Sequence, residues 1–566
     1  MRKKVSERRV LLVIGLITAL VMINLLASFV HYRFDLTEEK RYSLTKTTRQ
    51  LLSELEGPIS ITVFLKGDYP SGFRKLGNTT EDFLRILREA NSNKITYRFI
   101  SPEEEVAGKP WVDSLQALGA IPINLNVQVK SGQESKLVYP TALINYGDQT
   151  ALVNIYQGST RVITAQELNN AEALMEYQFA KTIDKLVHHE KPFIAYATGN
   201  GEPTDYRTFD LRQVVGTNYK LFMLDLTQEQ FIPDTIKALL IVKPATGFSD
   251  AEKLKIDQYI MRGGKVLWFI DNLYAEQDSL SFKSQLVAYD RNLGLQDILF
   301  NYGVRINADL VMDLQCDFLP FAVGGNNAAP QYEFLHWNYY PLFESRNNHL
   351  ITKNIGLVAG KFVNSIDTVE AQGIQKTFLL QSSSNSRVIS TPALISPNEN
   401  KNAPEDALFK QHDIPAAILL EGKFTSFFRN RLGRAKIDSL APFGGFRENS
   451  IDGNKMIVVA DGDIVLNNIS PKQGPLPMGM NLFTLGSQYE YQFANRDFLL
   501  NCLEYLTSKG NLIETRNKEI SLRLLDSRKV EEKRTMWQLI NIALPILLII
   551  IFGFIYQQIR SRKYAS

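Results

Sequence analysis

Two uncharged, apolar runs, residues 10–30 and 536–556, lie near opposite ends of the 566-residue chain. Each run holds 21 residues, and a helix of that length spans the hydrocarbon core of a bilayer, which is about 30 Å thick. Basic residues flank each run on its outer side, five before the first and three after the second. Because Lys and Arg favour the cytoplasmic side, we expect a two-pass protein of the inner (cytoplasmic) membrane, with both termini cytoplasmic and residues 31–535 in the periplasm.

The first run has a second interpretation, a cleaved signal peptide. Against it, the run is longer than the 7 to 15 apolar residues of a signal sequence, and no clear A-x-A cleavage site follows. Within the runs, Asn24 and Pro545 suggest packing against other membrane helices as well as against lipid. Two helices cannot enclose a pore, so any transport requires partner subunits.

The charge balance and the cysteines exclude several functions. The chain carries 63 basic and 60 acidic residues, a net charge of +3, and has no compact basic stripe, so we expect no nucleic-acid partner. Cys316 and Cys502 are the two cysteines, and an oxidising compartment would allow them to pair. Cys502 lies on the apolar face of an expected helix, which favours a buried thiol. The six histidines show no metal-ligand spacing.

The segment between the two runs predicts an α+β domain followed by an α/β domain. Strand-like runs joined by Gly-containing turns indicate the first. From Pro192, continuous apolar strands alternate with helices, which indicates a mostly parallel sheet covered on both faces. The expected segments are a cytoplasmic N-terminus (1–9), a transmembrane helix (10–30), a periplasmic α+β domain (31–188), a periplasmic α/β domain (189–515) with long loop insertions at about 310–450, a stalk (516–535), a second transmembrane helix (536–556) and a cytoplasmic C-terminus (557–566).

The candidate binding site lies beyond the carboxyl ends of the α/β strands, where ligands of such sheets bind. Polar residues and glycines follow two of these strands, at Gly199, Asn200, Gly201 and Glu202 and at Asp271 and Asn272. The most aromatic segment outside the membrane runs contains Trp337, Tyr339 and Tyr340. These rings either wall such a cleft for a protein or glycan ligand, or close a core beneath a long loop.

No motif predicts catalysis or a cofactor. The chain lacks a P-loop, so if it belongs to an ATP-driven complex another subunit must bind the ATP. The Gly199–Glu202 turn lacks the third glycine of a dinucleotide fingerprint. No G-x-S-x-G elbow occurs, which leaves Glu202 and Asp271 as an acid–base pair for a less favoured hydrolase hypothesis. Asp461 and Asp463 could bind a hard cation but are more often turn formers. We therefore expect no catalytic residue, no cofactor and no metal.

Five segments resemble the gliding-motility GldG family of the Bacteroidetes, auxiliary or "substrate-binding" components of ABC transporters. In chain order they are RFDLTEEKRYSLT, ATGNGE, IVKPATGFSDAEKLKIDQYIMRGGKVLWFIDN, VVADGDI and NRDFLLNCLEYLT. The resemblance covers nearly the full chain. It implies an amidotransferase-like central domain without catalytic residues, and Asn200 stands where the wider superfamily often has His.

The resemblance also implies an inner-membrane complex with a multi-spanning permease and a cytoplasmic ATPase, associated with gliding motility and linked protein secretion. The favoured function is thus that of a non-enzymatic periplasmic subunit of an ABC transporter. The alternative is an envelope protein that binds glycan or protein without ATP hydrolysis.

Overall fold

A computed structural model describes residues 15, 18–22, 43–67, 69–103, 105–106, 109–129, 132–156, 163–188, 191–277, 285–326, 329–396, 406–508, 512–517 and 527–564. The chain divides into two compact units, Met1–Glu519 and Ile520–Ser566. Most of the first apolar run, including Asn24, lies outside the described residues. The described residues 18–22 of that run are helical and exposed.

The second unit contains helix α12 (Ser527–Tyr564), with Pro545 inside it. Its Met536–Arg562 portion is 27 residues long, and the most apolar 18-residue stretch within it has a mean hydropathy of 2.6 and is not buried. Within the described part of the chain, this is the one helix that is long and apolar enough to cross a membrane. Anchoring at both ends stays a prediction.

The N-terminal part of the first unit is built on a four-stranded sheet of order β2-β1-β7-β8, in which β1 is parallel to β2 and antiparallel to β7. The elements are α2 (Lys46–Ser53), β1 (Ile59–Val63), α3 (Ser71–Ala90), β2 (Ile95–Phe99), β3 (Glu105–Val106), β4 (Lys109–Pro110), α4 (Trp111–Ala117), β5 (Ile123–Val129), β6 (Gly132–Val138), β7 (Thr141–Tyr146), β8 (Gln149–Asn154) and α5 (Ala165–Val187).

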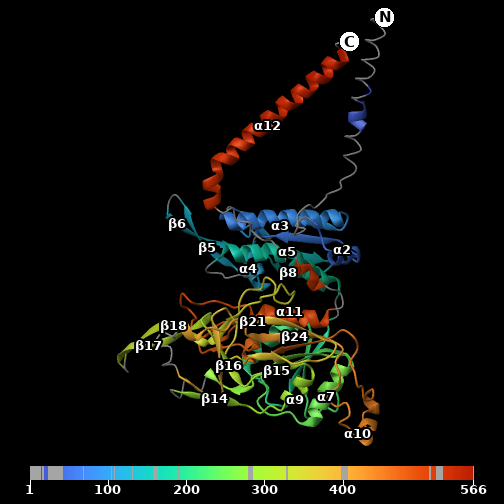
Figure 1. Ribbon diagram of the computed structural model, residues 1–566, viewed down its shortest axis with the longest axis vertical. Helices are drawn as coiled ribbons and strands as arrows, with labels where there is room; N and C mark the ends of the chain where they lie inside the picture. Colours follow the sequence, from blue (N-terminus) through green and yellow to red (C-terminus); the bar gives the residue numbers. More distant parts are fainter. Residues whose placement is uncertain are drawn as a thin grey trace. The chain divides into compact units, whose positions relative to one another are not determined.

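Helices α3 and α5 lie side by side in this part (Figure 1). Their apolar faces share one hydrophobic core with the sheet, including Leu84 of α3 and Phe179 of α5. A capping box fixes the start of α5, because Thr164 accepts the N–H of Glu167 while the Glu167 side chain returns to the Thr164 N–H.

A seven-stranded sheet of order β10-β9-β11-β12-β25-β24-β21 forms the centre of the first unit. Its elements and the adjoining helices are β9 (Phe193–Thr198), η1 (Tyr206–Thr208), α6 (Phe209–Asn218), β10 (Lys220–Asp225), β11 (Ile236–Val242), α7 (Asp250–Met261), β12 (Lys265–Phe269), β21 (Ile374–Gln381), β24 (Pro415–Gly422), β25 (Asn454–Val459), η5 (Asp463–Val465), α11 (Asn495–Thr507) and η6 (Leu512–Asn517).

The strands from β10 to β25 are parallel, while β24 and β21 are antiparallel. Along β11, Leu240 belongs to the core that includes α6 and α11, whereas Leu239 and Ile241 belong to the core that includes α7. Burial on both faces explains why this strand is continuously apolar. The prediction of a mostly parallel sheet covered on both faces is confirmed, and the fold is mixed α/β.

The remaining elements of the first unit form small sheets and short helices. They are β13 (Leu273–Tyr274), β14 (Leu286–Asp290), α9 (Gln296–Asn301), β15 (Val304–Ile306), β16 (Asp309–Asp313), β17 (Cys316–Asn326), β18 (Ala329–Phe343), β19 (Val358–Ala359), β20 (Ile366–Thr368), β22 (Ser386–Ser390), β23 (Ala393–Ile395), η3 (Asp406–Leu408), α10 (Arg434–Asp438), η4 (Ala441–Phe443), β26 (Ile469–Ser470) and β27 (Gly474–Pro475).

The expectation of long surface loops at about 310–450 is wrong for much of that segment, which contains strands. Ser382 and Ser383 of this segment satisfy buried hydrogen bonds instead of facing water. Ser383 donates from its backbone N–H to Asp313 at 2.7 Å, and Ser382 accepts the N–H of Ile414 at 2.9 Å. Cys316 and Cys502 are free and buried, as the buried-thiol interpretation expected for Cys502.

Candidate functional site

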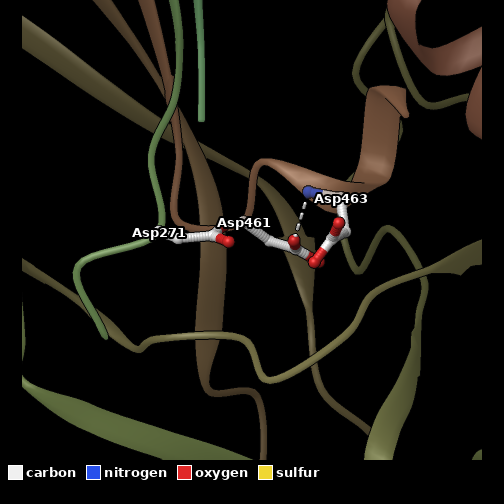
Figure 2. A group of neighbouring side chains, drawn as sticks. All are labelled: Asp271, Asp461 and Asp463. Atoms are coloured by element: carbon white, nitrogen blue, oxygen red, sulfur yellow. Dashed lines mark hydrogen bonds between the residues drawn. The ribbon is translucent and has the colours of Figure 1, made fainter. Parts of the chain in front are cut away.

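Three neighbouring parallel strands of the central sheet bring charged residues together where they end. Lys243 directly follows β11, Asp271 lies two residues beyond β12, and Asp461 lies two residues beyond β25. Figure 2 shows Asp271, Asp461 and Asp463, whose carboxylate oxygens lie within 4.8 Å of one another. This is the sheet edge at which α/β folds bind ligands.

The ammonium of Lys243 supplies positive charge to this cluster. Its Nζ lies 3.0 Å from an Asp271 oxygen, 2.7 Å from Asp463 and 3.1 Å from Glu276, and its side chain is 5% exposed. Lys243 has a φ of 46°, in the left-handed region. A Cβ at Gly462 would lie 2.5 Å from the Lys243 Cβ, so this approach requires glycine at position 462.

Backbone N–H groups hold the aspartates in place. Asp271 accepts the N–H of Gly462, while the two oxygens of Asp461 accept the N–H groups of Asp463 at 2.7 Å and of Lys361 at 2.8 Å. The Asp461–Asp463 contact is the bond expected of a turn-forming aspartate.

The charges of the cluster are set by competing effects. Burial raises the pKa of Asp461 well above its usual range, and the neighbouring carboxylates add to this. Burial also raises the pKa of Asp271, although Lys243 opposes it. Burial alone would raise the pKa of Asp463, but the nearby lysines hold it below its usual range. The desolvation that would lower the pKa of Lys243 is outweighed by the carboxylates, which raise it well above the ordinary value. The ion pairs thus favour the charged forms of Lys243 and Asp463, whereas burial favours the protonated form of Asp461.

The aspartates of this cluster are already engaged by other groups of the protein. Three carboxylates at this spacing are a donor set that suits a hard cation. The ammonium of Lys243 already contacts two of them, Asp271 and Asp463. The cluster thus contains its own counter-ion, Lys243. Its ion pairs connect the ends of neighbouring strands, which is a structural role.

The turn after β9 is held by its own hydrogen bonds. Gly199 and Gly201 have left-handed φ values of 112° and 78°, and an added Cβ at Gly201 would lie 2.9 Å from the Ala245 Cβ. Asn200 donates its N–H to Glu202 at 2.8 Å and its side-chain amide to Glu252 at 3.1 Å. Asn200 therefore fastens the turn to the start of α7.

The sequence-predicted carboxylates, Glu202 and Asp271, are not on adjacent strands. Glu202 follows β9 and Asp271 follows β12, and β11 lies between these two strands in the sheet. Asn272 is buried and joins the sheet to the following segment, because its N–H donates to Asn364 at 2.9 Å and its carbonyl accepts the N–H of Arg291 at 2.9 Å. The geometry does not assemble the acid–base pair of the hydrolase hypothesis.

The three aromatic residues proposed as a cleft wall lie in the interior. Trp337, Tyr339 and Tyr340 are 0%, 1% and 2% exposed. The Trp337 and Tyr339 ring centroids are 5.1 Å apart, and Phe362 packs on both tyrosines. Their faces are covered by other side chains, so the structure favours the alternative interpretation, a core.

Sequence reasoning missed Lys243, Glu276 and Arg291 as members of the cluster. Arg291 pairs with Glu276, which in turn contacts Lys243. One signal was available: Lys243 directly follows the apolar run ALLIV. A lysine at the end of a strand buried on both faces requires a buried partner.

A match to a protein-family model covers the whole central sheet. A family model described as "ABC-type uncharacterized transport system" matches residues 191–502, more than half of the chain. The chain belongs to this ABC-type transport-system family. A second model, a domain of unknown function (DUF7088), matches residues 38–145. The family match contains every strand of the seven-stranded sheet and the whole charge cluster.

The similar proteins and solved structures say little about the chemistry of this chain. A protein of Borreliella burgdorferi, named only "Uncharacterized protein", is 20% identical over 582 residues that cover 99% of each chain. Among solved structures, the IFT52 N-terminal domain is 12% identical with a TM-score of 0.31, covering 56% of this chain and 97% of that chain. A ThuA-like protein of Parabacteroides merdae is 10% identical with a TM-score of 0.26, covering 57% of this chain and 92% of that chain. Neither score assigns a fold or a function here.

Proposed function

We propose that this protein is a non-enzymatic auxiliary subunit of an ABC-type transport complex in the cytoplasmic membrane. The observation that carries the proposal is the family match over residues 191–502. The apolar part of α12 supports it, because its most apolar 18-residue stretch has a mean hydropathy of 2.6 and the helix is long enough to cross a membrane.

The non-enzymatic part of the proposal is supported by the sheet edge. Asp271 and Asp463 are paired with Lys243, and the Glu202 carboxylate accepts a hydrogen bond from its own turn. A general acid or base needs a carboxyl group that reaches a substrate proton; Lys243 occupies Asp271 and Asp463, and Glu202 is buried.

The partners follow from what the chain lacks in sequence. Without a P-loop it relies on a cytoplasmic ATPase, and with two membrane runs it relies on a multi-spanning permease. In this proposal Asn24 and Pro545 lie where the membrane helices pack against the permease. The amidotransferase-like fold and the association with gliding motility and linked protein secretion rest on the sequence resemblance alone.

Affinity purification of the tagged full chain in mild detergent tests this function. We expect the permease and the ATPase to co-purify with the chain. Replacing residues 536–556 by a poly-Leu span of equal length should keep the chain in the membrane while releasing the permease. A wild-type preparation without any ATPase would contradict the proposal, and a complex that survives the replacement would assign assembly to the folded unit.

A further inference from the structure

A groove of about 780 Å³ lies at one end of the four-stranded sheet. Its walls come from the segment that enters β1, from β2 and from the turn between β7 and β8, and include Glu56, Ser60, Thr96, Asn145, Tyr146 and Asp148. Binding sites for small molecules commonly have volumes of roughly 300–1,000 Å³. The groove is therefore large enough for a ligand of several rings.

The floor of the groove is a row of hydrogen-bonding side chains. Ser60 of β1 is in register with Thr96 of β2 and with Asn145 of β7. Register partners face the same side of a sheet, about 4.8 Å apart between strands. Ser60 and Thr96 are exposed and Asn145 is half-buried. Hydroxyl and amide groups both donate and accept hydrogen bonds, so the row matches a ligand that carries several hydroxyls.

One aromatic ring of the groove is fixed in place. The Tyr146 hydroxyl accepts the N–H groups of Glu56 at 3.2 Å and of Gly57 at 3.3 Å. The residue is half-buried, and a Cβ at Gly57 would meet the ring at 3.5 Å. A tyrosine already held by two hydrogen bonds offers an amphipathic contact surface at little cost in conformational entropy.

The charge of the groove selects among ligand classes. Glu56 and Asp148 are exposed, and none of the described residues that line the groove is Lys or Arg. Two carboxylates without a cation repel phosphates, nucleotides and carboxylic acids. Pro58 and Tyr146 add apolar surface beside the polar row, so the groove suits a ligand that has both hydroxyls and apolar faces. An uncharged, hydroxyl-rich ligand satisfies both constraints.

We propose that this groove binds a neutral saccharide, with hydroxyls of the sugar on the Thr96–Ser60–Asn145 row and a ring against Tyr146. The site is formed by residues between 56 and 149, separate from the charge cluster, and does not depend on the transport partners. It also differs from the aromatic segment 318–343, for which the sequence left a ligand platform and a core both open and whose Trp337, Tyr339 and Tyr340 the structure buries.

Titration calorimetry and saturation-transfer NMR on the detergent-solubilised full chain test the site. The probes are chitotetraose and maltotetraose as neutral saccharides and tetralysine as a cationic peptide. We expect saturable binding of at least one saccharide. Asn145→Ala, and separately Ser60→Ala, should each weaken it about tenfold. Thr217→Ala, an exposed threonine of α6, is the matched control and should bind as the wild type does.

Two carboxylate variants separate a saccharide from a cationic partner. Glu56→Gln and Asp148→Asn keep hydrogen-bonding groups while removing charge, so saccharide binding should remain within about threefold. The proposal is overturned if neither saccharide saturates the wild type, or if Asn145→Ala and Ser60→Ala, folded by circular dichroism, bind as well as the control. Tetralysine binding that is lost in Asp148→Asn, without saccharide binding, would instead make the groove a docking site for a basic protein segment.

Discussion

Lys243 shows how one buried side chain connects three strand ends. Replacing it by Met leaves Asp271 and Asp463 without their ammonium partner. Removing one member of a buried ion pair costs about 3–5 kcal/mol. We expect Lys243→Met to lower the free energy of unfolding by that amount in urea denaturation.

The control for Lys243→Met is Lys423→Met. Lys423 is 55% exposed and lies 3.5 Å from Asp452, which is 85% exposed. Exposed ion pairs contribute about 0–1 kcal/mol, so this variant should unfold close to the wild type. Equal effects of the two substitutions would contradict the assignment of Lys243 as the internal counter-ion.

Glu202 should make stability depend on pH. Burial raises its pKa from 4.5 to about 7. The folded state therefore holds this proton more tightly than the unfolded chain, and the contribution present below about pH 4.5 is lost as the pH rises through about 7. Glu202→Gln does not titrate, so the difference in unfolding free energy between variant and wild type should grow in favour of the variant by up to about 3 kcal/mol across this range. Parallel urea titrations at pH 4, 6 and 8 measure it, and a difference that is flat with pH would refute the prediction.

Trp337 separates a core role from a binding role. Its side chain is 0% exposed, and truncating a buried tryptophan to alanine costs about 3–5 kcal/mol. Trp337→Ala should therefore lower the unfolding midpoint strongly. Tyr332 of the same strand is 63% exposed, and Tyr332→Ala should change stability by less than about 0.5 kcal/mol. An unchanged unfolding midpoint for Trp337→Ala would contradict the core role and favour a role of this ring in ligand binding.

At the scale of elements, helix α5 is joined to α11 by a buried polar network. The Tyr177 hydroxyl donates to Glu504 at 2.5 Å, and Lys181 lies 3.0 Å from the same carboxylate. Arg516 lies 4.9 Å from the Tyr177 ring centroid. A helix whose other residues pack in the core of the N-terminal sheet is thus also fixed to the central sheet.

Tyr177→Phe removes the hydroxyl from this network and leaves Glu504 short of a donor. An unsatisfied buried group costs about 1–3 kcal/mol, so amide hydrogen exchange in α5 and α11 should speed up together. Tyr206→Phe, at a residue that is 67% exposed, should leave exchange unchanged. Faster exchange confined to α5 would show that the network does not couple the two helices.

The elements that the sequence predicted well are those whose signal is local. Apolar runs such as those of β11 and β12 identify buried parallel strands by themselves, and they also indicate where Asp271 stands. The pairing of Lys243 with Asp463 was not predictable in the same way, because 220 residues separate them and the strand order decides their contact. Composition wrongly predicted surface loops where polar residues are buried, as at Ser382 and Ser383.

At the scale of the whole molecule, the topology is the main open prediction. Cys316 and Cys502 are buried, so a cysteine placed at an exposed position can be labelled with little background. In intact cells with a permeabilised outer membrane, Ser439→Cys in the first unit should react with a membrane-impermeant maleimide. Ser561→Cys, on the basic side of α12, should react only after the inner membrane is opened. The reverse pattern would invert the orientation.

Leu239, Leu240 and Ile241 alternate between two hydrophobic cores, and this affects how the central sheet unfolds. Each such strand contributes side chains to both layers, so neither layer can melt while the other keeps its packing. A deletion of one residue within β11 would exchange the two sets of side chains and disrupt both layers at once. The sheet and its two layers should therefore unfold as one cooperative unit, and a destabilising change on one face should also destabilise the other.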